Sequence, residues 1–271
     1  MSVWLTIPSA RPVEEAAPVL AKWRERGYKI ALWRDDEASL AAEYSIHPDH
    51  ATRYGWTIKR ETDQDWKYPG YAVAVNKLIR AVMSFDPDAE WFISAGDDVS
   101  PDPFHTAEEI AKQCGDHFGG RIGELLNGVE RDPNWRTFGV MQPTGDRWGT
   151  PERPGKPARA YIDHVAGSAW IGREFARRAY QGNGPLWHEY FHMGVDEELQ
   201  KVAIKYGVFW QRPDLTHFHQ HWGRPREGER YGDADRMPDF LVKANSPEEW
   251  HRYKALLAAR EAAGFPWSEL L

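Results

Sequence analysis

Residues 91–103 have the sequence WFISAGDDVSPDP, and this stretch decides the class of fold. The apolar run from Trp91 to Ala95 is typical of a buried strand, and Gly96, Asp97 and Asp98 follow it directly. In α/β sheets, ligands gather at the carboxyl ends of the strands. The stretch therefore predicts an α/β protein with a ligand site where this strand ends.

The residues on either side alternate between strand and helix patterns. Strands are expected at residues 3–7, 28–34, 55–59 and 208–211, and helices at residues 16–23, 71–82, 172–180, 195–206 and after a capping box that begins at Ser246. Strands and helices in alternation imply a mainly parallel central sheet with right-handed crossovers and helices on its faces.

The composition restricts the classes of function. Asp and Glu number 41 against 34 Lys and Arg, and the net charge of −7 argues against indiscriminate binding to nucleic acid. Cys114 is the single cysteine, so an internal disulfide or a cysteine-based zinc cluster is excluded and a metal site must use His, Asp or Glu. The sequence has neither a secretory signal pattern nor an apolar run of ~20 residues, so we expect a soluble protein of the cytoplasm.

The pair Asp97-Asp98 is the strongest single chemical signal. Two adjacent carboxylates are costly unless a cation or hydrogen-bond donors neutralise them. Mg²⁺ and Mn²⁺ take carboxylate oxygens and leave positions open for phosphate. The alternative is a solvated loop in which Asp98 or Asp102 caps a turn.

Three histidines alternate in the segment LTHFHQHWGR, at His217, His219 and His221. On an extended segment this spacing points all three rings to one side. It favours a polar or metal-facing surface with at least one metal ligand. The alternative is that individual rings form structural hydrogen bonds.

A third cluster, Asp196, Glu197 and Glu198, opens a predicted helix. The helix dipole stabilises anions in the first turn, so Asp196 is expected to stay charged at neutral pH and to be available as a general base. Alternatively, Asp196 is only a helix N-cap.

In their order along residues 2–224, these parts resemble a glycosyltransferase of the GT-A fold. The parts are Pro8-Ser9-Ala10-Arg11 after the first strand, Asp35 after the second, Gly96-Asp97-Asp98, Gly167-Ser168-Ala169-Trp170 before a helix, Asp196-Glu197, and His219. The resemblance implies a GT-A-like Rossmannoid domain over residues 1–271. Within it, residues 1–100 would form a nucleotide-binding half, residues 101–224 an acceptor and metal half, and residues 225–271 a helical extension.

The resemblance also implies roles for individual residues. A nucleotide-diphosphate sugar, with UDP as the favoured nucleotide, would be bound by Pro8, Ser9, Arg11, Asp35 and Asp97. Mn²⁺ or Mg²⁺ would be held by Asp98 and His219. The catalytic residues would be Asp196 and Glu197, with Asp196 as the base of an inverting hexosyl transfer; a retaining enzyme would not need this base.

The acceptor has two candidate classes. Small phage transferases that glucosylate hydroxymethylated pyrimidines in DNA are one resemblance, and they would act in the host cytoplasm. The loop at residues 147–159, with Arg147 and Arg153, and the sequence at residues 224–226 offer basic side chains for phosphate contacts. Trp170 and Trp187 are candidate acceptor platforms, with core packing as the alternative. A glycan or small-molecule acceptor needs no basic patch.

Three other classes of protein share some of these features. A nucleotidyltransferase would share the sheet and the metal-bound phosphates, but it usually needs a Gly-rich loop early in the chain, and none follows the first strand. A metallohydrolase or non-haem iron oxygenase would use His217, His219 and Asp214. A non-catalytic sugar-binding module would not need Asp97, Asp98 and Asp196 together.

Overall fold

The structure of the protein is a computed structural model that describes residues 1–9, 11–34, 55–58, 69–125, 133–147, 149–150, 157–163, 165–224, 237, 239–242 and 244–265. The strands are β1 (Ser2–Ser9), β2 (Lys29–Arg34), β3 (Gly55–Ile58), β4 (Ala89–Ile93), β5 (Val99–Ser100), β6 (Val140–Pro143), β7 (Gly149–Thr150), β8 (Arg159–Ala160), β9 (Trp170–Gly172), β10 (Phe209–Arg212) and β11 (Phe218–His219). The helices are α1 (Val13–Glu25), α4 (Tyr71–Phe85), α5 (Ala107–Leu125), α6 (Arg173–Arg178), α7 (Val195–Lys205), α8 (Asp239–Val242) and α9 (Pro247–Ala262), with 3-10 turns η1 (Pro133–Thr137), η2 (Tyr161–Asp163) and η3 (Ala179–Gly182).

The centre of the fold is a seven-stranded sheet with the order β10-β6-β9-β4-β1-β2-β3. All its strands run in one direction except β9, which is antiparallel to both of its neighbours, β4 and β6. The predicted α/β class, with a mainly parallel sheet flanked by helices, is confirmed, and the arrangement is consistent with a GT-A-like fold.

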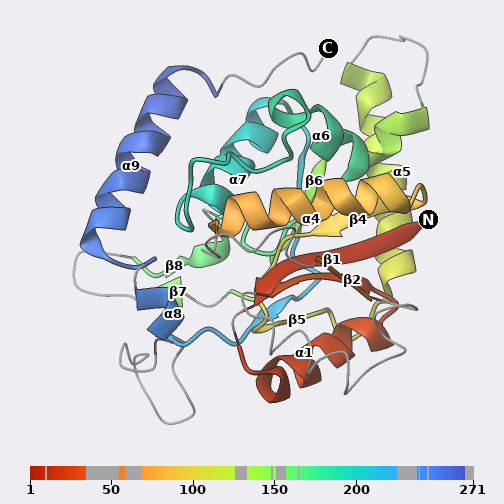
Figure 1. Ribbon diagram of the computed structural model, residues 1–271. Coiled ribbons are helices and arrows are strands. Elements are labelled where there is room, and N and C mark those ends of the chain that lie inside the picture. The colour runs from red at the N-terminus through yellow and green to blue at the C-terminus, as the bar shows by residue number, and fades with distance from the viewer. Residues whose placement is uncertain are drawn as a thin grey trace.

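Helices cover both faces of the sheet (Figure 1), with α4, α6 and α7 above it and α1 below it. Alternate side chains of each strand enter two separate cores. In β1, Leu5 packs with residues of α1 and α5, whereas Trp4 packs on the opposite side with residues of α4, α6 and α7. Burial on both faces is why the strands are apolar runs rather than alternating patterns.

Most predicted element boundaries lie within two residues of those observed, but α1 begins three residues before the expected start and α4 ends three residues after the expected end. The helix expected at residues 172–180 ends at Arg178, because Tyr180 and Gln181 take left-handed backbone angles with φ of 44° and 61°. The expected loop at residues 147–159 contains β7 and the first residue of β8, which pair with each other. Residues 148 and 151–156 of that loop lie outside the described part of the chain.

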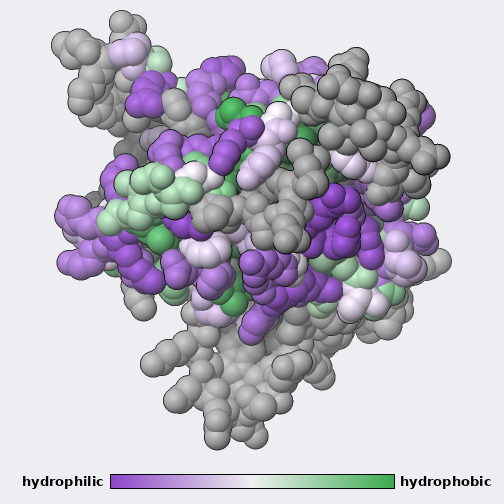
Figure 2. Space-filling view, turned by 90° about the horizontal axis from the view of Figure 1, so that it is seen from above, coloured by the Kyte–Doolittle hydropathy of each residue, from purple (hydrophilic) through white to green (hydrophobic). Residues whose placement is uncertain are grey.

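None of the described helices is long and apolar enough to cross a membrane. Seen from above, the coloured surface is mostly hydrophilic, with apolar side chains in small separate patches (Figure 2). The exposed apolar side chains on the part drawn in colour therefore form no broad face.

Candidate functional site

The carboxyl ends of β1 and β4 meet at one edge of the sheet, because these two strands pair in parallel. Ser9 at the end of β1 donates a hydrogen bond from Oγ to Asp97 Oδ2 at 2.5 Å, and Arg11 Nε donates to Asp97 Oδ1 at 2.7 Å. Burial raises the pKa of Asp97 above its usual value, although these two hydrogen bonds oppose the shift. Both Asp97 oxygens are thus engaged by the first strand loop.

Asp98 has a different environment. Arg11 Nη2 donates to its Oδ2 at 3.2 Å, while its Oδ1 lies 3.3 Å from His219 Nε2. Burial alone would raise the pKa of Asp98, but the hydrogen bond and charge of His219, together with Arg11, lower it to about 2. Gly96 leaves room for this carboxylate, since a Cβ at position 96 would stand 2.5 Å from Asp98 Oδ1. Asp98 is therefore ionised at neutral pH.

The histidine segment reaches Asp98 through the short β5–β11 pair, in which His219 lies opposite Val99. The Gln220 N–H also donates to the Asp98 carbonyl at 2.8 Å. Asp146 Oδ2 accepts from the His219 N–H at 3.1 Å and forms an ion pair with Arg224. These backbone contacts place His219 beside Asp98.

The other two histidines of the segment line the same cavity in different environments. His217 is buried, packs edge-on against Trp23 with ring centroids 5.1 Å apart, and its pKa is lowered to about 4 by desolvation. His221 accepts a hydrogen bond on Nδ1 from the Gly223 N–H at 3.0 Å. A neutral ring that accepts on Nδ1 carries its proton on Nε2.

A divalent cation fits the pair formed by Asp98 and His219. Two ligands of one Mg²⁺ or Mn²⁺ ion lie about 3 Å apart, close to the 3.3 Å between Asp98 Oδ1 and His219 Nε2. Among the described residues no group of three or more His, Cys, Asp or Glu side chains is arranged to hold a metal. The protein would therefore supply two ligands, and the bound substrate and water would supply the rest.

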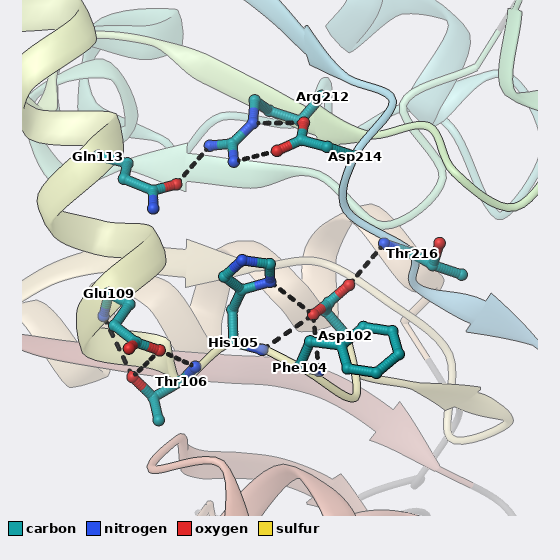
Figure 3. A network of polar contacts seen from close by, with 9 residues as sticks. All are labelled: Asp102, Phe104, His105, Thr106, Glu109, Gln113, Arg212, Asp214 and Thr216. Carbon is teal, nitrogen blue, oxygen red and sulfur yellow. Dashed lines mark hydrogen bonds and ion pairs between the residues drawn. The ribbon is translucent and has the colours of Figure 1, made fainter.

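Asp102 joins the loop that follows the Asp pair to the segment that precedes the histidines (Figure 3). Its Oδ1 accepts from the Phe104 N–H at 2.9 Å, the His105 N–H at 3.0 Å and His105 Nδ1 at 2.8 Å, and its Oδ2 accepts from the Thr216 N–H at 2.9 Å. Asp102 thus caps the turn before α5 and also fixes the start of the histidine segment. In the same view Asp214 points to Arg212, with Arg212 Nη2 and Asp214 Oδ2 2.6 Å apart.

The ion pair between Arg212 and Asp214 argues against one alternative, a metal centre that includes Asp214. Asp214 does not line the cavity that contains His217 and His219. The metal centre of His217, His219 and Asp214, which a hydrolase or an oxygenase would use, is therefore not formed.

Asp196 lies in the first turn of α7, and the N-cap of this helix is Gly194 rather than Asp196. Contrary to the expectation from the helix dipole, its pKa is raised, chiefly by desolvation and further by Glu197, while the charge of His219 opposes the shift. Gly167 adjoins this carboxylate, since a Cβ there would lie 3.6 Å from Asp196 Oδ2. A carboxylate with a raised pKa is a stronger base than an exposed one.

These groups line one cavity of about 960 Å³. The predicted site residues that line it are Pro8, Ser9, Arg11, Asp97, Asp98, Asp196, Glu197 and His219. The volume lies at the upper end of the range for ligand sites, about 300–1,000 Å³. Asp35 and Arg153 lie outside the described residues.

The structure places three predicted acceptor residues elsewhere. Trp170 was expected to contact the acceptor, and this is wrong: it is 0% exposed in β9 and packs in the core against Trp91. Trp187 does not line the cavity and stacks under the Arg260 guanidinium, 3.7 Å from its ring centroid. Arg147 is exposed outside the cavity and pairs with Asp163 at 2.9 Å.

Several residues that sequence reasoning missed line the same cavity. Tyr71 is the first residue of α4, and its hydroxyl donates to the Ala95 carbonyl at 3.0 Å beside the Asp pair. His192 packs edge-on against Tyr71, and burial lowers its pKa. Tyr161 and Trp250 are exposed aromatic residues of the wall. No spacing in the sequence separates these aromatic residues from those of the core.

Comparisons with known proteins give only distant likenesses, and these are to solved structures. No protein-family model matches the sequence, and no curated protein matches it. Among solved structures, the fold is similar to the crystal structure of a glycosyltransferase involved in the glycosylation of the major capsid of PBCV-1, with 10% identity and a TM-score of 0.33 over 78% of this chain and 82% of that chain. A likeness this distant assigns neither a family nor an activity to the chain.

Proposed function

We propose that the protein is a metal-dependent glycosyltransferase that moves a sugar from a nucleotide-diphosphate sugar to an acceptor hydroxyl. One observation carries the proposal. A single cavity at the carboxyl ends of β1 and β4 contains the Asp98–His219 pair together with Asp196, a carboxylate of raised pKa. The proposal accounts for both features, because transfer from a diphosphate needs a stabilised leaving group and an activated hydroxyl.

The donor would lie along the strand ends. Pro8, Ser9 and Arg11 form this part of the wall, and Arg11 is held between Asp97 and Asp98. Because Asp97 accepts from both Ser9 and Arg11, the loop after β1 has its position fixed before a ligand arrives. A fixed loop reduces the cost of ordering the site on binding. UDP is the first nucleotide to test.

Asp98 and His219 would hold Mn²⁺ or Mg²⁺. When bound, the ion supplies positive charge next to the leaving diphosphate. The protein keeps Asp98 ionised, with a pKa of about 2, and fixes His219 through β5–β11 pairing. Asp97 would instead hold Ser9 and Arg11 in place, since its two oxygens accept hydrogen bonds from these residues.

Asp196 would act as the general base. As the acceptor oxygen bonds to the anomeric carbon and the bond from that carbon to the diphosphate breaks, the proton of the hydroxyl passes to Asp196. This assignment implies inversion at the anomeric carbon. Glu197 also lines the cavity and would accept hydrogen bonds from a bound substrate.

The proposal is tested in two steps. The protein is first screened with nucleotide sugars for slow donor hydrolysis without acceptor, with release of the nucleoside diphosphate as the measurement. Thermal unfolding is then measured with UDP, with Mn²⁺ and with both. We expect stabilisation that requires both ligands, by about 2.7 kcal/mol at a hundredfold excess over Kd.

Two variants sharpen this test. Asp98→Asn should abolish the joint stabilisation, whereas Asp116→Asn, a surface change on α5, should leave it intact. Full activity of Asp98→Asn would refute the metal assignment. Stabilisation by the metal alone, with no donor hydrolysis, would refute glycosyl transfer.

A further inference from the structure

We propose that Trp250 and Tyr161 form an acceptor subsite for an uncharged saccharide in the same cavity. The proposal rests on the proposed glycosyl transfer and names the class of its acceptor. These two residues take the place of Trp170 and Trp187 as the candidate acceptor platforms, because neither Trp170 nor Trp187 lines the cavity.

Trp250 and Tyr161 are unusual among the aromatic side chains of the protein. The largest of these, such as Trp23, Trp91 and Trp170, are fully buried in the core. Trp250 is 38% exposed and Tyr161 is 45% exposed, and both line the cavity. Exposed ring faces in a cavity supply an apolar surface for the C–H face of a sugar ring.

The charges of the cavity favour an uncharged acceptor over nucleic acid. Among the described residues that line it, Arg11 is the one Arg or Lys, and it is paired with Asp97 and Asp98. Neither Asp196 nor Glu197 forms a salt bridge with any residue in the described part of the chain. Carboxylates accept hydrogen bonds from sugar hydroxyls, whereas they repel phosphates that no bound cation neutralises.

The fold holds Trp250 near the proposed base. Trp250 packs edge-on against Tyr253, with ring centroids 5.2 Å apart. Tyr253 in turn packs closely against Gly194, since a Cβ at position 194 would lie 2.7 Å from the Tyr253 ring. Since Gly194 directly precedes the first turn of α7, the contact links Trp250 to the turn that carries Asp196.

The start of α9 is itself fixed. Ser246 caps the helix by accepting a hydrogen bond from the Glu249 N–H at 3.3 Å. Leu241 of α8 and Trp250 of α9 line the same cavity as Tyr161, which follows β8 directly. Two separate parts of the chain thus bring one aromatic ring each to the cavity.

The test measures saccharide binding without glycosyl transfer. The full-length protein is titrated by calorimetry with methyl hexopyranosides and with cello- and malto-oligosaccharides, each with and without UDP and Mn²⁺. We expect at least one saccharide to bind. Trp250→Ala and Tyr161→Ala should each weaken its binding about tenfold. The matched control is Phe104→Ala, which removes an aromatic ring that is 82% exposed and outside the cavity, and it should leave Kd unchanged.

Two outcomes would overturn the proposal. One is that no saccharide of the panel binds under either condition, or that neither cavity variant changes Kd. The other is that hydroxymethylated duplex DNA binds instead and loses affinity in Trp250→Ala. If Trp250→Ala loses binding only because α9 folds incorrectly, Tyr161→Ala still tests the subsite, because Tyr161 belongs to η2 and not to α9. Donor hydrolysis by the unmodified protein is scored separately, so loss of the subsite and loss of glycosyl transfer are distinguishable.

Discussion

Replacing Asp102 by Ala is expected to destabilise the protein by about 3–5 kcal/mol. Asp102 is 1% exposed and accepts four hydrogen bonds, three of them from the backbone N–H groups of Phe104, His105 and Thr216. Hydrogen bonds to a charged group contribute about 1.5–3 kcal/mol each and are not additive. A loss of this size leaves the protein folded if its total stability is in the usual range of about 5–15 kcal/mol.

The measurement is urea unfolding followed by circular dichroism, with Asp116→Ala as the control. Asp116 forms an exposed ion pair with Lys112 on α5, so its removal should change the stability of the protein far less than the removal of Asp102. Asp102→Ala should also weaken the joint stabilisation by UDP and Mn²⁺, because Thr216 starts the segment that carries His219.

The pH dependence gives a second check on the same variant. Burial would raise the pKa of Asp102, but hydrogen bonds from Thr216, His105 and Phe104 outweigh it and hold the pKa below its usual value. A carboxyl of lowered pKa stabilises the fold above its unfolded pKa, and this contribution is lost as pH falls through the folded pKa. The difference between wild type and variant should therefore shrink below about pH 4. A loss under 1 kcal/mol at pH 7, or an equal loss in Asp116→Ala, would refute the reasoning.

Three further predictions concern the cavity and its support. Gly96→Ala should remove the joint UDP and Mn²⁺ stabilisation in thermal unfolding, since its Cβ would displace the neighbouring carboxylate, whereas Gly120→Ala, where a Cβ meets nothing within 4 Å, should not. Asp196→Asn should abolish transfer, yet the variant should unfold at a higher urea concentration than the wild type at pH 7. The pKa of Asp196 is raised in the folded protein, so ionisation of this carboxyl opposes folding once the pH rises above its unfolded pKa. A variant less stable than the wild type at pH 7 would contradict this. Arg260→Leu should cost about 3–5 kcal/mol in urea unfolding by leaving the buried Glu198 unpaired, and adding Glu198→Gln should recover part of it; no recovery would contradict the assignment.

The part of the fold that could be predicted is the part with strong local patterns. β1, β2 and β4 are apolar runs that end in polar residues, and a parallel sheet follows from the helices between them. The antiparallel β9 could not be predicted, because a three-residue strand has no periodicity and its direction depends on both neighbours.

The candidate site likewise combines residues that have a local signal in the sequence with contacts that depend on distant residues. Asp97 and Asp98 were found because their position after a strand is a local signal. The separate environments of the two carboxylates were not predictable, since they depend on Arg11 and on the distant His219. For Asp196 the helix dipole was visible in the sequence, but desolvation by the surrounding chain was not, and desolvation is the larger effect.

Trp170 and Trp250 show why composition does not identify a binding surface. The sequence contains 14 Trp residues, and each has the same chemistry until burial is known. Trp170 begins a strand whose neighbours on both sides cover it, whereas Trp250 lies in the first turn of a surface helix. The secondary structure around each Trp residue would have been needed to decide which of them can contact a ligand.

The link between Asp102 and Thr216 joins residues 114 positions apart. Contacts of long sequence separation carry a large loop-closure cost and tend to form after local ones. During synthesis, the N-terminal strands can pair while the histidine segment has not yet been made. A nascent chain, or a fragment that stops before residue 216, would carry the Asp pair without His219, so the proposed metal pair of Asp98 and His219 would be complete only after residue 219 has been made.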